Sequence, residues 1–112
     1  MSMHYIGFRG YGFRVNEVTW KKEWDMDELH DFIVDEVILG TCVDLCYGED
    51  LGDCVIISDC LPWESKWHED LEKIKTHEDA NDYLYDLFKE YIDMSEIDFK
   101  LLIDHLEDCY YG

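Results

Sequence analysis

The chain has 112 residues, of which 47% are hydrophobic, and its 28 acidic and 9 basic residues give a formal net charge of −19 at pH 7. This composition is too apolar for a disordered acidic tail and is sufficient for one domain with a modest core. The charge excludes direct binding to nucleic acid, because that binding depends on neutralising phosphates. No apolar run approaches the roughly 18 residues of a membrane span, and the start lacks a signal-peptide core, so we expect a cytoplasmic protein.

Residues 5–15 read YIGFRGYGFRV, in which RGYGF matches the first five positions of an RNA-binding strand motif. The later positions do not fit, because Arg14 and Asn16 stand where that motif has an aliphatic and an aromatic residue. We therefore interpret residues 3–18 as a β-hairpin with a two-residue turn at Gly10–Tyr11. One face of this hairpin would carry Ile6, Phe8, Phe13 and Val15.

Residues 26–39 are predicted to form a helix. Asp25 or Asp27 is a suitable cap, and Gly40 suits the position after the helix. Its apolar residues recur at helical spacing: Leu29, Phe32, Ile33, Val37 and Ile38.

A second hairpin is predicted from TCVDLCY and DCVIISD, which flank the turn-rich GEDLG. In this register Tyr47 faces Asp53 and Cys46 faces Cys54. One face would carry Val43, Leu45, Val55 and Ile57. The other would carry Cys42, Asp44, Cys46, Cys54 and Ile56, and we expect it to contact water or a partner.

The last part of the chain has three helix signals. Pro62 opens a predicted helix over residues 62–75. Thr76 and Asp79 form a capping-box pattern before a helix that reaches about residue 92, and Ser95 precedes a last helix with Phe99, Leu102, Ile103 and Leu106 inward. The predicted order is ββαββααα, a single α+β domain over residues 1–112 in which two antiparallel hairpins form one sheet with about four helices.

Five cysteines, an odd number, fit a reducing compartment. Cys42, Cys46, Cys54 and Cys60 are close in sequence, but their spacings and the expected strand differ from the turn-based pairs of structural zinc sites. We therefore expect reduced thiols, no metal and no cofactor. If their segments are helical, Trp20 and Trp24 lie one turn apart, and so do Trp63 and Trp67. These side chains would either pack in the core or anchor an interface.

Acidic residues form rows at helical spacing. On the helix predicted for residues 76–93, the carboxylates share nearly one face and span about 21 Å; they are Asp79, Asp82, Asp86, Glu90 and Asp93. The helix at 26–39 carries a second row of Asp27 or Glu28, then Asp31 and Asp35, and the last helix carries Asp104, Glu107 and Asp108. Like charges four residues apart destabilise a helix by about 0.2–0.5 kcal/mol per pair. Either these rows are a solvated acidic face, or a function maintains them.

Imitation of nucleic-acid phosphates is such a function. Duplex DNA carries about one charge per 1.7 Å of axis, and two neighbouring rows would present about one per 2.6 Å. The predicted partner-binding residues are Asp79, Asp82, Asp86, Glu90 and Asp93, extended by Asp27, Asp31 and Asp35. No nucleophile–base pair, phosphate-binding loop or metal motif is visible, so we do not expect an enzyme.

In size, charge and small α+β build, the chain resembles phage-encoded DNA mimics, including anti-restriction and anti-CRISPR inhibitors. The resemblance lies in the whole chain, and no motif transfers a role to any residue. It implies an inhibitor in the cytoplasm of a bacterial host, bound to a basic nucleic-acid-binding protein such as a nuclease. An immunity protein that neutralises a cognate nuclease toxin, and an acidic adaptor for another basic protein, remain alternatives.

Overall fold

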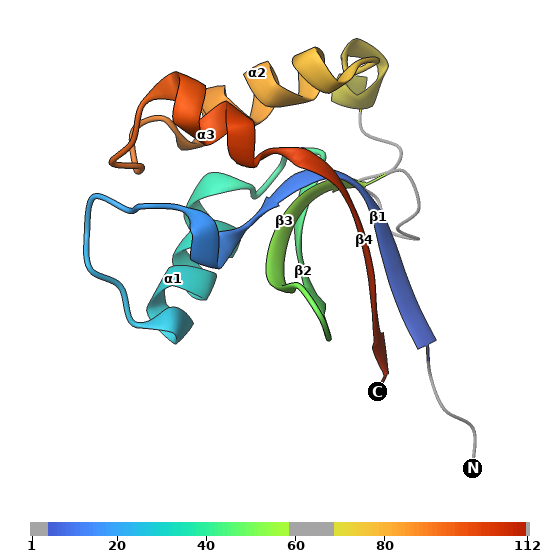
Figure 1. Cartoon of the computed structure of the whole chain (residues 1–112), viewed down its shortest axis with the longest axis horizontal. Coiled ribbons are helices and arrows are strands. Elements are labelled where there is room, and N and C mark those ends of the chain that lie inside the picture. The colour runs from blue at the N-terminus through green and yellow to red at the C-terminus, as the bar shows by residue number, and fades with distance from the viewer. Residues whose placement is uncertain (1–4, 59–68, 112) are drawn as a thin grey trace.

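The computed structural model describes residues 5–58 and 69–111, and it has the predicted α+β class, with a four-stranded antiparallel sheet and three α-helices in that part of the chain (Figure 1). The strands are β1 (Tyr5–Arg14), β2 (Val43–Gly48), β3 (Gly52–Ser58) and β4 (Asp104–Tyr111). The helices are α1 (Met26–Phe32), α2 (His77–Phe88) and α3 (Glu96–Leu102). Shorter turns are the 3₁₀ turns η1 (Val15–Glu17) and η4 (Glu69–Lys73) and the π-helical turn η2 (Ile33–Val37).

Residues 5–14, YIGFRGYGFR, form one continuous strand, so the hairpin predicted over residues 3–18 is wrong. The sheet order is β2-β3-β1-β4, and β1 joins its two halves. Residues 5–12 of β1 pair with β4, whereas residues 10–14 pair with β3. Because an uninterrupted strand alternates its side chains, Phe8 and Phe13 lie on opposite faces of the sheet instead of sharing one.

The sheet curls so strongly that its two outer strands meet. In a flat sheet β2 and β4 would lie about 14 Å apart, since neighbouring strands are separated by about 4.8 Å. Instead, the Glu49 N–H in the β2–β3 turn donates a 3.0 Å hydrogen bond to the Cys109 carbonyl of β4. The Asp108 carboxylate of β4 accepts hydrogen bonds from the N–H groups of Asp50 (3.0 Å) and Leu51 (2.7 Å) in the same turn. The β2–β3 hairpin therefore folds back onto β4.

Gly10 and Gly12 permit this curl because they lie where β1 presses against β3. A Cβ atom on Gly10 would lie 2.1 Å from the Ile57 carbonyl oxygen, and one on Gly12 would lie 2.0 Å from the Val55 carbonyl oxygen. Glycine within a strand often marks such a close approach of another backbone. Gly10, which the sequence analysis assigned to a turn, thus serves with Gly12 the contact between two strands.

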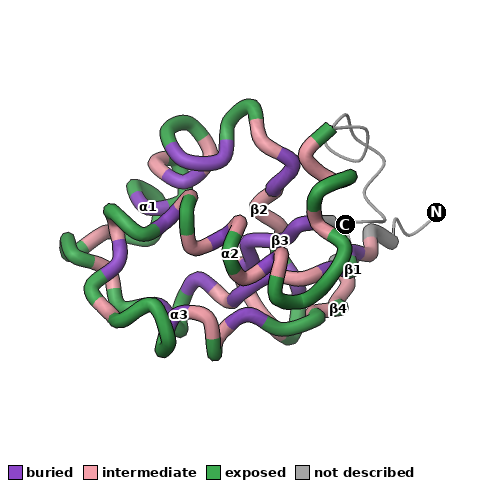
Figure 2. Tube along the Cα trace, turned by 90° about the horizontal axis from the view of Figure 1, so that it is seen from above, coloured by how far each residue is buried: buried purple, intermediate pink, exposed green. Residues whose placement is uncertain are grey.

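The larger apolar cluster lies between the sheet and the three helices. At its centre Phe13 of β1 meets Phe88 of α2 and Phe99 of α3, each with ring centroids 5.1 Å apart and in edge-to-face orientation. Figure 2 shows that buried residues follow the central strands and one side of the helices. A single core therefore fixes all three helices on one side of the sheet.

A smaller cluster of Phe8, Cys54 and Ile56 lies inside the curl of the sheet. The β2–β3 hairpin has the predicted register, with Cys46 opposite Cys54. The four residues predicted to share one face, Val43, Leu45, Val55 and Ile57, all pack in the larger cluster. The expectation that the other face contacts water or a partner is wrong for Cys54 and Ile56, which the curled sheet buries fully, whereas Asp44 and Cys46 are half-buried. Cys42 precedes β2 and is buried in the larger cluster.

The helix predicted at residues 26–39 forms in two parts. Asp25 is its N-cap, as one of the two predicted alternatives, and α1 continues to Phe32. The chain then widens into η2, where the Ile38 N–H donates to the Ile33 carbonyl, five residues earlier, at 3.0 Å. The side of this segment that faces the core carries Leu29, Ile33 and Val37.

The predicted capping box opens α2. Thr76 Oγ1 accepts the Asp79 N–H at 3.1 Å, and the Asp79 carboxylate accepts the Thr76 N–H at 3.2 Å. The helix ends at Phe88 and not near residue 92, because the following chain pairs with an earlier segment. Trp20 and Ile92 form an isolated antiparallel bridge there.

The last predicted helix is correct only in its first half. Ser95 caps α3 as predicted, but Ile103 has an extended backbone (φ −83°, ψ 122°) and ends the helix. The chain continues as β4 along the free edge of β1, so Leu106 lies on a strand. The element order in the described residues is therefore βαββααβ instead of ββαββααα. Of the helix predicted at 62–75, residues 62–68 lie outside the described part, with Trp63 and Trp67, and residues 69–73 form η4.

Candidate partner-binding surface

The acidic row predicted on the helix at 76–93 begins with a residue that has an internal role. Asp79 belongs to the capping box, and its carboxylate also accepts the Lys75 N–H at 3.0 Å. The pKa of Asp79 is lowered, chiefly by the hydrogen bond from Lys75 and also by those from Thr76. This carboxylate is therefore engaged by the start of its own helix.

The next two members of the row lie beside lysines of the same chain. Lys100 on α3 donates hydrogen bonds to Asp82 at 2.7 Å and to Glu96 at 2.9 Å, and these two bonds raise the pKa of Lys100. Lys89 lies 3.6 Å from Asp86. Such exposed pairs add little stability, but they reduce the negative charge that this face offers to a partner.

Glu90 and Asp93 lie beyond the end of α2 and are exposed. The Asp93 N–H donates to the Thr19 carbonyl at 2.7 Å, in the bridge that draws the chain away from the helix. The five acidic residues therefore do not form the continuous helical row of about 21 Å that their spacing predicted.

The second predicted row lies on the solvent side of α1 and η2. Asp27, Asp31 and Asp35 are all exposed, and together they span about 12 Å at 1.5 Å per residue. Glu28 and Glu36 are exposed beside them. We call these five residues the α1 acidic surface.

No lysine or arginine occurs in the sequence between Lys22 and Lys66. The α1 acidic surface therefore has no Lys or Arg within its own helix or directly after it, whereas Lys89 directly follows α2 and Lys100 reaches Asp82 of α2 from α3. A nearby histidine is present, with His30 Nδ1 at 3.9 Å from Asp31. Of the two predicted rows, the one on α1 therefore has less of its negative charge compensated by neighbouring lysines.

Aromatic side chains fix α1 to the rest of the molecule. Trp24 stacks on Phe32 with ring centroids 4.8 Å apart, and Phe32 meets Tyr91 edge-on at 5.1 Å. Trp20 Nε1 donates to the Val15 carbonyl at 3.3 Å. Residues 20–24 are not helical, so Trp20 and Trp24 do not form the expected pair one turn apart, and both pack against the larger cluster.

The three acidic residues predicted on the last helix lie on or at the start of β4 and do not form a row. Asp108 points into the β2–β3 turn, whereas Asp104 and Glu107 are exposed on opposite faces of the strand. Burial acts to raise the pKa of Asp108, but the N–H groups of Leu51, Cys109 and Asp50 together lower it.

Two of the described cysteines, Cys42 and Cys54, are buried thiols with little nucleophilic character. Burial raises the pKa of Cys42, and it raises the pKa of Cys54 to about 11. A thiol with a raised pKa is a poor nucleophile and a poor metal ligand. In residues 5–58 and 69–111, no three His, Cys, Asp or Glu side chains are grouped to hold a metal ion. Cys60 lies outside the described part.

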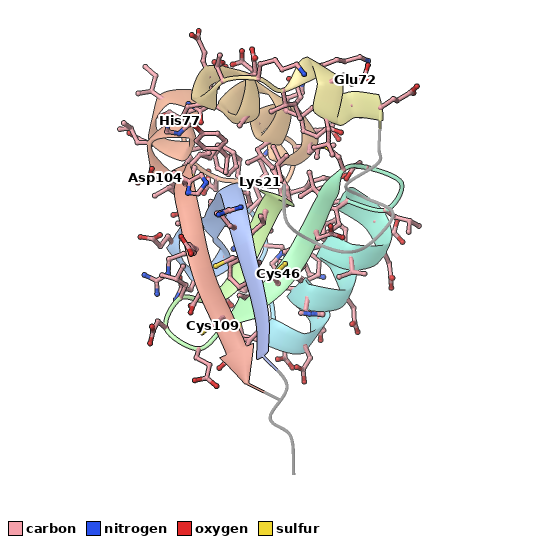
Figure 3. The ribbon with its side chains drawn as sticks, turned by 90° about the vertical axis from the view of Figure 1, so that its right-hand side faces the viewer. Lys21, Cys46, Glu72, His77, Asp104 and Cys109 are labelled. Carbon is pink, nitrogen blue, oxygen red and sulfur yellow. The ribbon has the colours of Figure 1, made fainter. Side chains whose placement is uncertain are left out.

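Two features of the surface were missed by the sequence analysis. Tyr11 stacks on His77 with centroids 4.8 Å apart and meets His105 edge-on at 5.4 Å. Figure 3 shows His77 near Asp104, where α2 meets β4, and His77 Nε2 lies 2.7 Å from the Ile103 carbonyl oxygen. No sequence spacing connects these residues, since β1, α2 and β4 are distant in the chain.

The second missed feature is a pair of exposed apolar residues on α3. Ile97 and Leu101 are 73% and 77% exposed. Their exposure could have been predicted from the sequence, because neither residue is among those predicted to face inward on this helix.

No helix in the described ranges combines the length and apolarity that a membrane crossing requires. Neither a protein-family model, nor a curated protein, nor a solved structure matches this chain.

Proposed function

We propose that this protein is an acidic inhibitor that imitates nucleic-acid phosphates and occupies the basic DNA- or RNA-binding site of a nucleic-acid enzyme. The observation that supports this proposal most strongly is the α1 acidic surface, an exposed set of carboxylates in a sequence stretch without Lys or Arg. The proposed contact residues are Asp27, Asp31 and Asp35, with Glu28 and Glu36 beside them. The residues on α2 take a lesser part, because Asp79 caps its helix and Asp82 and Asp86 have lysine partners.

The spacing of the carboxylates fits this role. Successive members of the α1 row are separated by four residues, or about 6 Å along the helix. One strand of duplex DNA carries a phosphate about every 3.4 Å, so the spacing agrees within a factor of two. Arginine and lysine side chains that hold phosphates bind carboxylates through the same charge-assisted hydrogen bonds. The net charge of −19 would also steer such a partner towards the protein.

The target we favour is a bacterial defence nuclease, which makes the protein an anti-CRISPR or anti-restriction inhibitor of a phage or mobile element. An immunity protein for a secreted nuclease toxin would use the same electrostatics. Gene neighbourhood separates these two roles: a toxin gene directly upstream favours immunity, and phage genes favour a mimic. An adaptor for a basic protein other than a nuclease would inhibit neither kind of enzyme.

The test compares two triple variants that remove the same charge. D27N/D31N/D35N neutralises the α1 row, and D82N/D86N/E90Q is the matched control on and after α2. Each is assayed for inhibition of DNA cleavage by purified restriction and RNA-guided nucleases. We expect the first variant to lose at least tenfold in inhibitory potency. The control should lose less than threefold, because Asp82 and Asp86 already have lysine partners.

Duplex DNA should compete with the protein for the nuclease, and the protein alone should not bind DNA. Inhibition should weaken as salt rises, because the Debye length falls from about 10 Å at 0.1 M to about 3 Å at 1 M. If D27N/D31N/D35N inhibits as well as the parent, the α1 row is not the contact surface. If the parent inhibits none of these nucleases and DNA does not compete for any captured partner, the proposed function is wrong.

A further inference from the structure

The outward side of α3 carries two large apolar residues one helical turn apart. Ile97 and Leu101 lie at positions i and i+4, so their side chains are neighbours on the helix surface. They are 73% and 77% exposed, whereas Phe99, on the opposite side, is fully buried. Isolated exposed apolar residues are normal on protein surfaces. A neighbouring pair on one helix face instead forms a contiguous apolar contact, which we call the α3 apolar pair.

Negative charge borders the α3 apolar pair. Asp98 lies between its two members in sequence, on one flank of the pair, and is exposed. Lys100 lies on the other flank, but its ammonium group is held by Asp82 at 2.7 Å and by Glu96 at 2.9 Å. The pair is therefore an apolar contact with an acidic border, whose nearest cation is already neutralised.

The charge of the whole molecule decides what can cover this pair. A second copy of a chain with net charge −19 would be repelled at close range, as would an anionic lipid surface or a nucleic acid. A partner must offer an apolar surface to the pair and positive charge to the acidic border. A protein surface that combines an apolar groove with a basic rim offers both. Removing the apolar pair from water would favour binding.

We infer that the α3 apolar pair is a docking site for a cationic protein segment, with Ile97 and Leu101 in an apolar groove and Asp98 paired with a basic residue on its rim. Apolar anchors at the centre of an interface with charged residues around them are the usual arrangement in protein complexes. The inference shares with the proposed function the positive charge of the partner. It does not depend on the α1 acidic surface or on nuclease inhibition.

The experiment uses a defined probe. One fluorescent peptide is an amphipathic helix of lysine with leucine along one face, and a second has glutamine in place of every leucine at the same charge. Dissociation constants are measured by fluorescence anisotropy with the full chain in 0.15 M NaCl. We expect the lysine–leucine peptide to bind at least tenfold more tightly, with NMR amide shifts concentrated at residues 96–101.

Two variants locate the contact. I97S/L101S should remove the tenfold preference for the leucine-containing peptide. L39S is the matched control, because Leu39 is 76% exposed but lies outside α3, and it should retain the preference. All three positions are exposed, so neither variant should unfold the protein, and urea denaturation checks this.

Several results would overturn the inference. These are equal binding of the two peptides, an equal loss of the preference in L39S, or amide shifts elsewhere than α3. A dimer in sedimentation that I97S/L101S abolishes would identify a second copy as the occupant. Flotation with phosphatidylserine vesicles that depends on the pair would identify a membrane. D27N/D31N/D35N should keep the preference, so failure of the proposed function would not be mistaken for failure of this inference.

Discussion

Individual acidic residues in this protein serve two different purposes. Asp79 and Asp108 accept backbone N–H groups and hold a helix start and a turn in place. The members of the α1 row are exposed on a helical segment without Lys or Arg. The same side chain type is thus structural where it meets orphan N–H groups, and available to a partner where the neighbouring backbone is already paired within a helix.

Asp108 provides a test of the structural role. D108A should lower the free energy of unfolding by about 1.5–3 kcal/mol, because the N–H groups of Asp50 and Leu51 lose a charged acceptor. Urea denaturation at pH 7 measures this change. E107Q on the same strand is the control, and a surface substitution of this kind should stay within about 0.5 kcal/mol of the parent.

The contribution of Asp108 should depend on pH in a defined direction. Its pKa is lower in the folded protein than in the unfolded chain. The stabilisation is therefore fully present above the unfolded value of about 3.9 and is lost as pH falls through the lowered folded pKa. The stability gap between parent and D108A should be constant near neutral pH and should shrink below about pH 4. A gap that widens on acidification would contradict this assignment.

At the scale of elements, β1 determines the shape of the sheet. Its residues 5–12 pair with β4 and its residues 10–14 pair with β3. Gly10 and Gly12 lie in the part that pairs with both, and they let β1 approach β3 closely. The curl buries a face of the β2–β3 hairpin that alternation marked as half polar. It also closes β4 against the β2–β3 turn, which reduces the unpaired edge that a flat sheet would present to other chains.

A single methyl group added where β1 presses against β3 should lower the free energy of unfolding substantially. G12A places a Cβ atom 2.0 Å from the Val55 carbonyl oxygen, and we expect a loss near the upper end of about 1–3 kcal/mol. G40A is the comparison, because Gly40 has φ 79° but open space around its Cβ position, and left-handed backbone alone costs about 1–2 kcal/mol. The urea midpoints of the two variants show whether the close contact at Gly12 costs more stability than the left-handed backbone at Gly40. Equal losses would mean that the close contact at Gly12 costs no more than the left-handed backbone at Gly40.

At the scale of the whole molecule, net charge opposes the folded state. The folded chain confines a net charge of −19 within a molecule whose radius of gyration is 13.7 Å. Such self-repulsion destabilises a compact protein. The charge is far beyond the magnitude of about 2–8 that solubility requires in a small domain, which is consistent with a binding role for the surface.

Salt should therefore stabilise the protein. Raising NaCl from 0.01 M to 0.15 M shortens the Debye length from about 30 Å to about 8 Å. We expect the melting temperature to rise by about 4–8 °C, which corresponds to about 1 kcal/mol. D27N/D31N/D35N should gain less than the parent in the same circular dichroism measurement. A melting temperature that falls with salt would show that local attractions dominate.

Local signals in the sequence determined several elements correctly. The caps at Asp25, Thr76 and Ser95 and the register of the β2–β3 hairpin depend on residues only a few positions apart, so their chemistry is visible in a short window. The excess of acidic residues and the row on α1 were visible for the same reason. These signals were enough to predict the α+β class and part of the candidate surface.

Long-range contacts decided the rest. Only the pairing of β1 with both β3 and β4 shows that Gly10 lies within a strand and not in a hairpin turn. The bridge from Trp20 to Ile92 ends α2 earlier than its sequence pattern predicts. Residues 104–108 were predicted to continue a helix, but they pair with the free edge of β1 as part of β4. Backbone hydrogen bonds between distant segments outweigh local spacing. Only the tertiary structure therefore shows which acidic residues the fold itself uses. Once these are set aside, the α1 row is the stronger candidate surface.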